Sequence, residues 1–88
     1  MDILWDEAKS RKLKKERGIS FEEIVPIILD KKYLAVLENP ARTDQMIFVV
    51  KYKNYTYVVP FIIDSKNNIV LKTIFPSRRF HKLFGAEE

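Results

Sequence analysis

The sequence predicts an α+β domain: two N-terminal helices packed on an antiparallel meander sheet of three or four strands, followed by a short C-terminal helix. Helix-start and helix-stop residues gather before residue 30. β-Branched and aromatic residues dominate residues 46–63, and short polar turns separate the apolar runs. A chain of 88 residues has room for one hydrophobic core, so we expect a single domain over residues 1–88.

The first predicted helix covers residues 7–17 and follows a short apolar segment, residues 3–5, that favours a strand. Asp6 is a suitable N-cap, because its carboxylate can accept the free N–H groups of the first helical turn. Gly18 is a suitable C-terminal stop, because glycine readily adopts the left-handed conformation that ends helices. Few residues of this helix are apolar, so we expect it to lie on the surface.

The second predicted helix begins at Ser20. The segment Ser-Phe-Glu-Glu is a capping box, in which Ser20 caps the N–H of Glu23 and Glu23 reaches back to the N–H of Ser20. Ile19 and Ile24 occupy the two positions of a hydrophobic staple. Pro26 lies beyond the first turn, so we expect it to kink or shorten the helix.

The rest of the chain predicts strands over residues 33–37, 46–52, 55–63 and 69–75, and then a helix over residues 78–84.

Two turns set the expected strand register. A two-residue turn between the second and third of these strands places Tyr52 opposite Tyr55. The polar residues 65–68 form the next turn and place Ile63 opposite Val70. Pro60 cannot donate a hydrogen bond within the sheet, so we expect a bulge near it.

Composition excludes several classes of site. The chain has no cysteine, which excludes disulfides and thiolate chemistry, and its single histidine excludes a multi-histidine metal centre. Two glycines are too few for a glycine-rich phosphate loop. We expect neither a metal nor a cofactor.

No apolar run is long enough for a membrane span, and the N-terminus lacks the pattern of a signal peptide. We therefore expect a cytoplasmic protein that does not bind membranes.

Positive charge is concentrated in two segments of a chain whose net charge is +4. Residues 9–17 hold six basic residues against one acidic residue, and residues 72–82 hold four basic residues and no acidic one. Two basic clusters on a nearly neutral body suit a polyanion such as nucleic acid. An ordinary solvated helix face is the alternative interpretation.

Four residues are candidates for chemistry. Lys9 lies in the first turn of a helix, where a cation opposes the helix dipole, so a bound phosphate is one explanation and an ordinary solvated lysine is the other. Arg78 and Arg79 begin the last helix, where guanidinium and free N–H groups suit phosphate. His81 could act as a general acid or base, or could be a plain surface histidine.

Three short blocks resemble the BrnT-type toxins of bacterial toxin–antitoxin systems. Residues 5–9 match an opening Trp-Asp-x-x-Lys. Residues 17–23, Arg-Gly-Ile-Ser-Phe-Glu-Glu, resemble His-Gly-Val-Ser-Phe-Glu-Glu, with arginine in place of histidine. Residues 74–79, Ile-Phe-Pro-Ser-Arg-Arg, resemble a strand-to-helix segment often written Ile-Ile-Ser-Ala-Arg-Lys. Phe80 and His81 stand where that family usually has alanine and threonine.

The resemblance implies a RelE-like fold and a small RNA-cleaving toxin that needs no metal. In such enzymes the RNA 2′-hydroxyl attacks the adjacent phosphate, and the protein stabilises the charge that develops. The resemblance also implies a partner antitoxin, of the ribbon–helix–helix type. Its functional positions fall on Lys9 and Arg78, with Arg79 in support.

The combined hypothesis assigns catalytic roles to Lys9, Arg78 and His81. It assigns RNA binding to four further basic residues: Lys12, Lys72, Arg79 and Lys82. The alternative is a non-catalytic module that binds nucleic acid or protein with the same basic surface. The catalytic assignments require Lys9 and Arg78 to meet across the fold, and side chains on opposite faces would overturn them. Clustering of Lys9, Arg78 and Arg79 in one groove favours the nuclease, whereas basic residues spread over a convex face favour simple binding.

Overall fold

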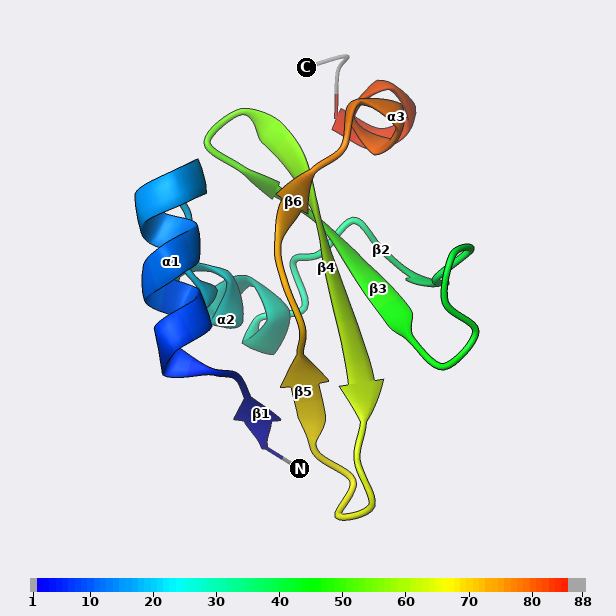
Figure 1. The fold of residues 1–88 in the computed structure, drawn as a ribbon. Helices are drawn as coiled ribbons and strands as arrows, with labels where there is room; N and C mark the ends of the chain where they lie inside the picture. The colour runs from blue at the N-terminus through cyan, green and yellow to red at the C-terminus, as the bar shows by residue number, and fades with distance from the viewer. Residues whose placement is uncertain (1, 86–88) are drawn as a thin grey trace.

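A mixed sheet with helices on both faces forms the structure, a computed structural model that describes residues 2–85 (Figure 1). Its elements, in chain order, are β1 (Ile3–Leu4), α1 (Glu7–Arg17), α2 (Phe21–Leu29), β2 (Ala35–Glu38), β3 (Met46–Tyr52), β4 (Tyr55–Ile63), β5 (Ile69–Leu71), β6 (Phe75–Pro76), α3 (Arg78–Phe80) and the π-helical segment η1 (His81–Gly85).

The strands form one six-stranded sheet in the order β1-β5-β4-β3-β2. Strand β5 pairs with the last part of β4, and β6 pairs with an earlier part of the same strand. Every pairing is antiparallel except that of β1 with β5. The predicted α+β class is therefore confirmed. The sheet is larger than a simple meander because the N-terminal residues add a parallel strand at its edge, which local sequence patterns do not reveal.

Both predicted helix starts and the stop of α1 are confirmed. The Asp6 carboxylate accepts hydrogen bonds from Ala8 N at 2.8 Å and Lys9 N at 3.2 Å. Gly18 ends α1 with a φ of 75°, in the left-handed region. Glu23 accepts a hydrogen bond from the backbone N–H of Ser20 at 2.8 Å. Helix α2 is short, nine residues with a proline inside, as expected.

A buried serine joins the two helices. Ser10 Oγ donates to Glu22 Oε1 at 2.5 Å and accepts from Phe21 N at 3.0 Å. Ser10 is 1% exposed, so water does not replace these partners. The hydroxyl supplies the first turn of α2 with one of the acceptors that a helix start needs.

Replacing Ser10 by alanine leaves the N–H of Phe21 buried without an acceptor. We expect the free energy of unfolding to fall by about 1–3 kcal/mol, less a few tenths for the better helix propensity of alanine. Urea denaturation measures the change. Lys15→Ala, at an exposed position of α1, is the matched control and should change stability by less than about 0.5 kcal/mol. Equal effects of the two substitutions would contradict this role of Ser10.

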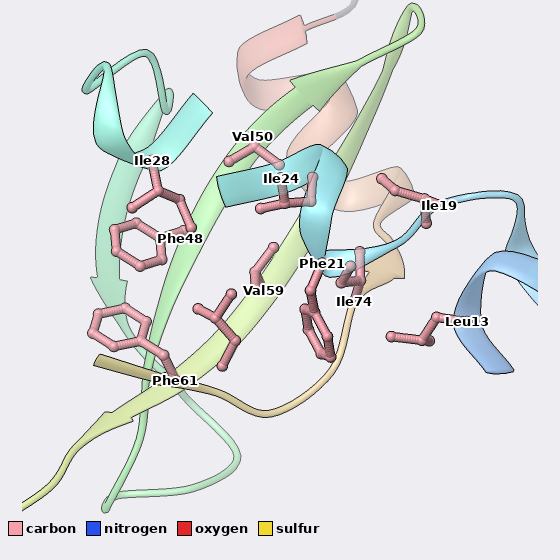
Figure 2. Close-up of a cluster of buried hydrophobic side chains, with 11 residues drawn as sticks. Leu13, Ile19, Phe21, Ile24, Ile28, Phe48, Val50, Val59, Phe61 and Ile74 are labelled. Carbon is pink, nitrogen blue, oxygen red and sulfur yellow. The ribbon is translucent and has the colours of Figure 1, made fainter. Parts of the chain in front are cut away.

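The two faces of the sheet bury separate cores. Neighbouring residues of a strand point to opposite faces. On one face, α1 and α2 cover the larger core, which Figure 2 shows around Phe21, Ile24 and Phe48. On the other face, Phe80 and Phe84 of the C-terminal segment pack on Ile47, Val49 and Val58. The N-terminal helices and the C-terminal segment therefore lie on opposite faces of the sheet.

One predicted register is confirmed and the other is wrong by one residue. Tyr52 pairs with Tyr55, as the two-residue turn predicts. Ile63, however, pairs with Ile69, and Val70 pairs with Ile62. The Asp64 carboxylate closes the turn by accepting from the N–H groups of residues 66 and 68 at 2.9 and 2.8 Å, and this brings Ile69 into register.

The irregularity expected near Pro60 does not lie between β3 and β4, which pair without interruption across this residue. The irregularity lies on the other side of β4, in the segment that joins β5 to β6. There, residues 72–74 face only residues 59–60, so the pairing is interrupted. The carbonyl of Pro60 points to that side, since it accepts from Lys72 N at 2.8 Å. The missing N–H of Pro60 therefore faces the gap and leaves the pairing with β3 intact.

The last strand and the last helix differ in detail from the prediction. The strand expected over residues 69–75 is split into β5 and β6. The helix expected over residues 78–84 begins as α3 and widens into η1. The predicted cap is confirmed, because Ser77 Oγ accepts from Phe80 N at 3.2 Å.

Candidate functional site

Three tyrosines gather where the β3–β4 hairpin turns, and we call Tyr52, Tyr55 and Tyr57 with this turn the tyrosine end of the sheet. Lys53 and Asn54 have φ values of 49° and 67°, as a two-residue hairpin turn of type I′ requires. The ring of Tyr57 meets those of Tyr52 and Tyr55 edge-on, with centroids 6.4 and 6.0 Å apart. Tyr52 and Tyr57 also pack against the larger core, so packing accounts for these two rings.

Glu23 links the helices to the tyrosine end. Its Oε2 accepts from Tyr52 Oη at 2.6 Å and from Lys14 Nζ at 2.8 Å. The hydrogen bond from Lys14, followed by that from Tyr52, lowers the pKa of Glu23 to about 2. The same carboxylate raises the pKa of Tyr52 by accepting its hydroxyl proton in a hydrogen bond. Glu23 is therefore a carboxylate at neutral pH, tied to α1 and to β3.

A lowered folded-state pKa makes Glu23 a source of acid sensitivity. The stabilisation is fully present above the ordinary pKa of 4.5 and is lost as pH falls toward about 2. Since the side chain is 27% exposed, solvent screening reduces the effect to about 1–2 kcal/mol. We expect Glu23→Gln to lower stability at pH 7 and to flatten the loss of stability between pH 5 and pH 2.

Urea denaturation over that pH range measures the effect of Glu23→Gln. Glu16→Gln is the matched control, because it removes the same charge at an exposed position of α1. A Glu23→Gln protein that keeps the full acid sensitivity of the wild type would contradict this account of Glu23.

His81 is held from two sides at the tyrosine end. Its Nδ1 lies 3.0 Å from Thr56 Oγ1, and Thr56 is fully buried. Its ring stacks on Tyr55, with centroids 4.3 Å apart and planes inclined by 23°. The backbone reinforces the contact, because Ser77 N donates to Thr56 O and His81 N donates to Ser77 O, both at 3.0 Å. The ring is half-buried, so part of it faces solvent.

The basic residues of the C-terminal segment flank this histidine in the sequence. Arg78, Arg79 and Lys82 lie within one turn of His81 and are exposed. The guanidinium of Arg79 lies over the ring of Phe80, 5.6 Å from its centroid. Three cations and an imidazole on one short helical segment can hold a phosphate group.

Helix α1 reaches the same region with its last turn. Arg17 Nη1 donates to the carbonyl of Ile74, just before β6. Lys14, one turn earlier, pairs with Glu23. The arginine that replaces histidine in the family pattern therefore joins α1 to the strand that leads to Arg78.

Lys9 and Lys12 are more distant from the C-terminal segment. Lys9 lies in the first turn of α1, about 12 Å along the helix axis from Arg17. That turn follows β1, which pairs with β5 at the end of the sheet where β4 finishes (Figure 1). Since α1 and α3 also cover opposite faces, the fold keeps Lys9 apart from Arg78. Both lysines are exposed on α1.

Lys72 lies outside this group as well. It follows β5 at the gap opposite Pro60, and its side chain is exposed. Seven basic and histidine positions are singled out from the sequence. Arg78, Arg79, His81 and Lys82 share one helical segment because they are neighbours in the sequence, and the fold leaves Lys9, Lys12 and Lys72 elsewhere.

Two residues of this region were not identified from the sequence. The role of Glu23 in the capping box explains that residue locally and hides its contacts with Lys14 and Tyr52. Thr56 carries one signal, since it is a polar residue in a strand whose neighbours on the same face, such as Val58, are apolar. No local pattern places it next to His81, which is 25 residues away.

Within residues 2–85, no three His, Asp or Glu side chains gather as a group that could hold a metal ion. In the same part of the chain, no helix is both long and apolar enough to cross a membrane.

Comparison of the structure with solved structures finds a match that covers nearly the whole chain. The crystal structure of the Brucella abortus ribonuclease toxin BrnT aligns with 88% of this chain and 96% of its own, with a TM-score of 0.64 and 17% sequence identity. The chain has the fold of BrnT. The BrnT likeness confirms the fold that the three sequence blocks imply. No family model matches the sequence, and no curated protein matches it.

Proposed function

We propose that the chain is a ribonuclease toxin that cleaves RNA at the tyrosine end without a metal ion. The observation that carries the proposal is that Thr56 and Tyr55 hold His81 one helical turn from Arg78, on a fold shared with a ribonuclease toxin. A fixed imidazole and a guanidinium within one helical turn are suitable groups for the phosphate of an RNA backbone.

In the proposed reaction the RNA supplies its own nucleophile. The 2′-oxygen forms a bond to the adjacent phosphorus, and the bond from phosphorus to the 5′-oxygen breaks. The proton of the 2′-hydroxyl is lost, and the departing 5′-oxygen gains one. The products are a 2′,3′-cyclic phosphate and a 5′-hydroxyl. Arg78 offsets the negative charge that develops on the phosphate oxygens.

The surrounding basic residues have supporting roles in this proposal. Arg79 and Lys82 bind the phosphates that flank the cleaved one. Lys9, Lys12 and Lys72 belong to outlying parts of the basic surface, where they attract RNA without touching the reacting phosphate. A partner antitoxin, of the ribbon–helix–helix type, covers this surface and blocks RNA. Both proteins act in the cytoplasm.

A cleavage assay in EDTA tests the proposed function. Purified protein is incubated with a defined single-stranded RNA, and the product ends are analysed. Products ending in 2′,3′-cyclic phosphate support the proposal. Intact RNA that the protein binds with strong salt dependence would overturn it in favour of a non-catalytic nucleic-acid-binding module.

A further inference from the structure

The buried hydroxyl of Thr56 has consequences for the chemistry of His81. Thr56 is 0% exposed, so its O–H group must find an acceptor inside the protein. Within residues 2–85, the partner of Thr56 Oγ1 is His81 Nδ1, at 3.0 Å. Only one proton can lie between these two atoms, and it belongs either to the oxygen or to the nitrogen.

The two arrangements differ in cost. If Nδ1 carries the proton, it donates to Oγ1, and the hydroxyl proton of Thr56 is left in a buried place without an acceptor. If Nδ1 is unprotonated, it accepts from the hydroxyl and both atoms are satisfied. An unsatisfied buried donor is costly, so the second arrangement is preferred. A neutral imidazole has one protonated nitrogen, which must then be Nε2.

We propose that Thr56 is a positioning residue that holds neutral His81 with its proton on Nε2. The bonds from the two ring nitrogens point away from each other, so the Nε2–H group is directed away from Thr56. The stacked ring of Tyr55 prevents the imidazole from turning freely. In the reaction, which rests on the proposed function, Nε2–H donates a hydrogen bond to a phosphate oxygen, next to Arg78.

NMR of the ring nitrogens shows directly which nitrogen of His81 carries the proton. His81 is the only histidine of the chain, so its nitrogen signals in a long-range ¹H–¹⁵N spectrum need no separation from others. At a pH where the ring is neutral, we expect a proton on Nε2 and a bare Nδ1. We expect the Nδ1 signal to move in Thr56→Val and to stay in place in the matched control Thr56→Ser, which keeps the hydroxyl. A proton on Nδ1, or an Nδ1 signal that Thr56→Val leaves unchanged, would overturn the assignment.

Kinetics on the same proteins separates positioning from simple structural support. We expect Thr56→Val to lower kcat by about tenfold with KM unchanged, and Thr56→Ser to restore it to within about twofold. We also expect His81→Gln, whose amide can donate from the place of Nε2–H, to cleave faster than His81→Ala. Equal rates for these two His81 variants would overturn the donor role.

The two proposals fail separately. If the wild-type protein does not cleave RNA but shows the expected nitrogen signals, the proposed function fails and the position of the proton stands. If it cleaves RNA while Nδ1 carries the proton, this inference fails and the proposed function stands.

Discussion

Replacing Arg78 by alanine is expected to reduce RNA cleavage by about 100- to 1,000-fold. Loss of a single group that stabilises developing charge has effects of this size. Arg78 is exposed at the start of α3, so the folded structure should remain. The rate with a defined RNA in EDTA measures the effect, with circular dichroism to confirm folding.

Arg42→Ala is the matched control for Arg78→Ala. Arg42 is also an exposed arginine, but it lies in the loop between β2 and β3, which leads into the end of the sheet away from the tyrosines. Its ion pair with Asp44 is at the surface, so its loss should be nearly neutral. Arg78→Lys keeps the charge and loses the forked geometry, and we expect an intermediate rate. A folded Arg78→Ala protein that cleaves at half the wild-type rate or faster would contradict the role of Arg78.

Replacing Phe21 by alanine is expected to lower the free energy of unfolding by about 3–5 kcal/mol. Phe21 is 0% exposed and lies at the centre of the larger core, between α2 and the sheet (Figure 2). Its ring also contacts Trp5, with centroids 6.4 Å apart. Since each kcal/mol of lost stability lowers the melting temperature of a domain of this size by about 4–8 °C, the melting temperature should fall by about 12–40 °C.

Phe75→Ala is the matched control for Phe21→Ala. Phe75 is 38% exposed in β6, so its truncation removes less buried surface and should cost about 1 kcal/mol or less. Thermal unfolding followed by circular dichroism compares the two variants. Similar melting temperatures for both would contradict the position of Phe21 at the centre of the core.

Features that depend on neighbours in sequence could be predicted from the sequence. The cap at Asp6, the stop at Gly18 and the pairing of Tyr52 with Tyr55 each depend on a few adjacent residues. Features that depend on distant segments could not. The parallel pairing of β1 with β5 joins residues 3–4 to residues 69–70, and no local pattern marks it. Pro60 shows an intermediate case, since the sequence predicts an irregularity there but not which strand carries it.

In the candidate site, too, features of adjacent residues could be predicted from the sequence and contacts between distant segments could not. Arg78 and His81 are adjacent in sequence to a helix start, so the chain itself marks them as a pair. The family resemblance and the charge pattern predict a site shared by Lys9 and Arg78, but the fold separates α1 and α3 on opposite faces of the sheet. Thr56 becomes visible only when β4 and the C-terminal segment are brought together.

The most direct test of the central claim is to locate bound RNA on the protein. A 2′-O-methyl oligonucleotide keeps the phosphates but lacks the attacking hydroxyl, so it binds without being cleaved. Its titration into isotope-labelled protein is followed by NMR. We expect the largest shift changes at Tyr55, Thr56, Arg78 and His81. Changes confined to the first turn of α1 around Lys9, or no saturable change, would contradict the claim that RNA is cleaved at the tyrosine end.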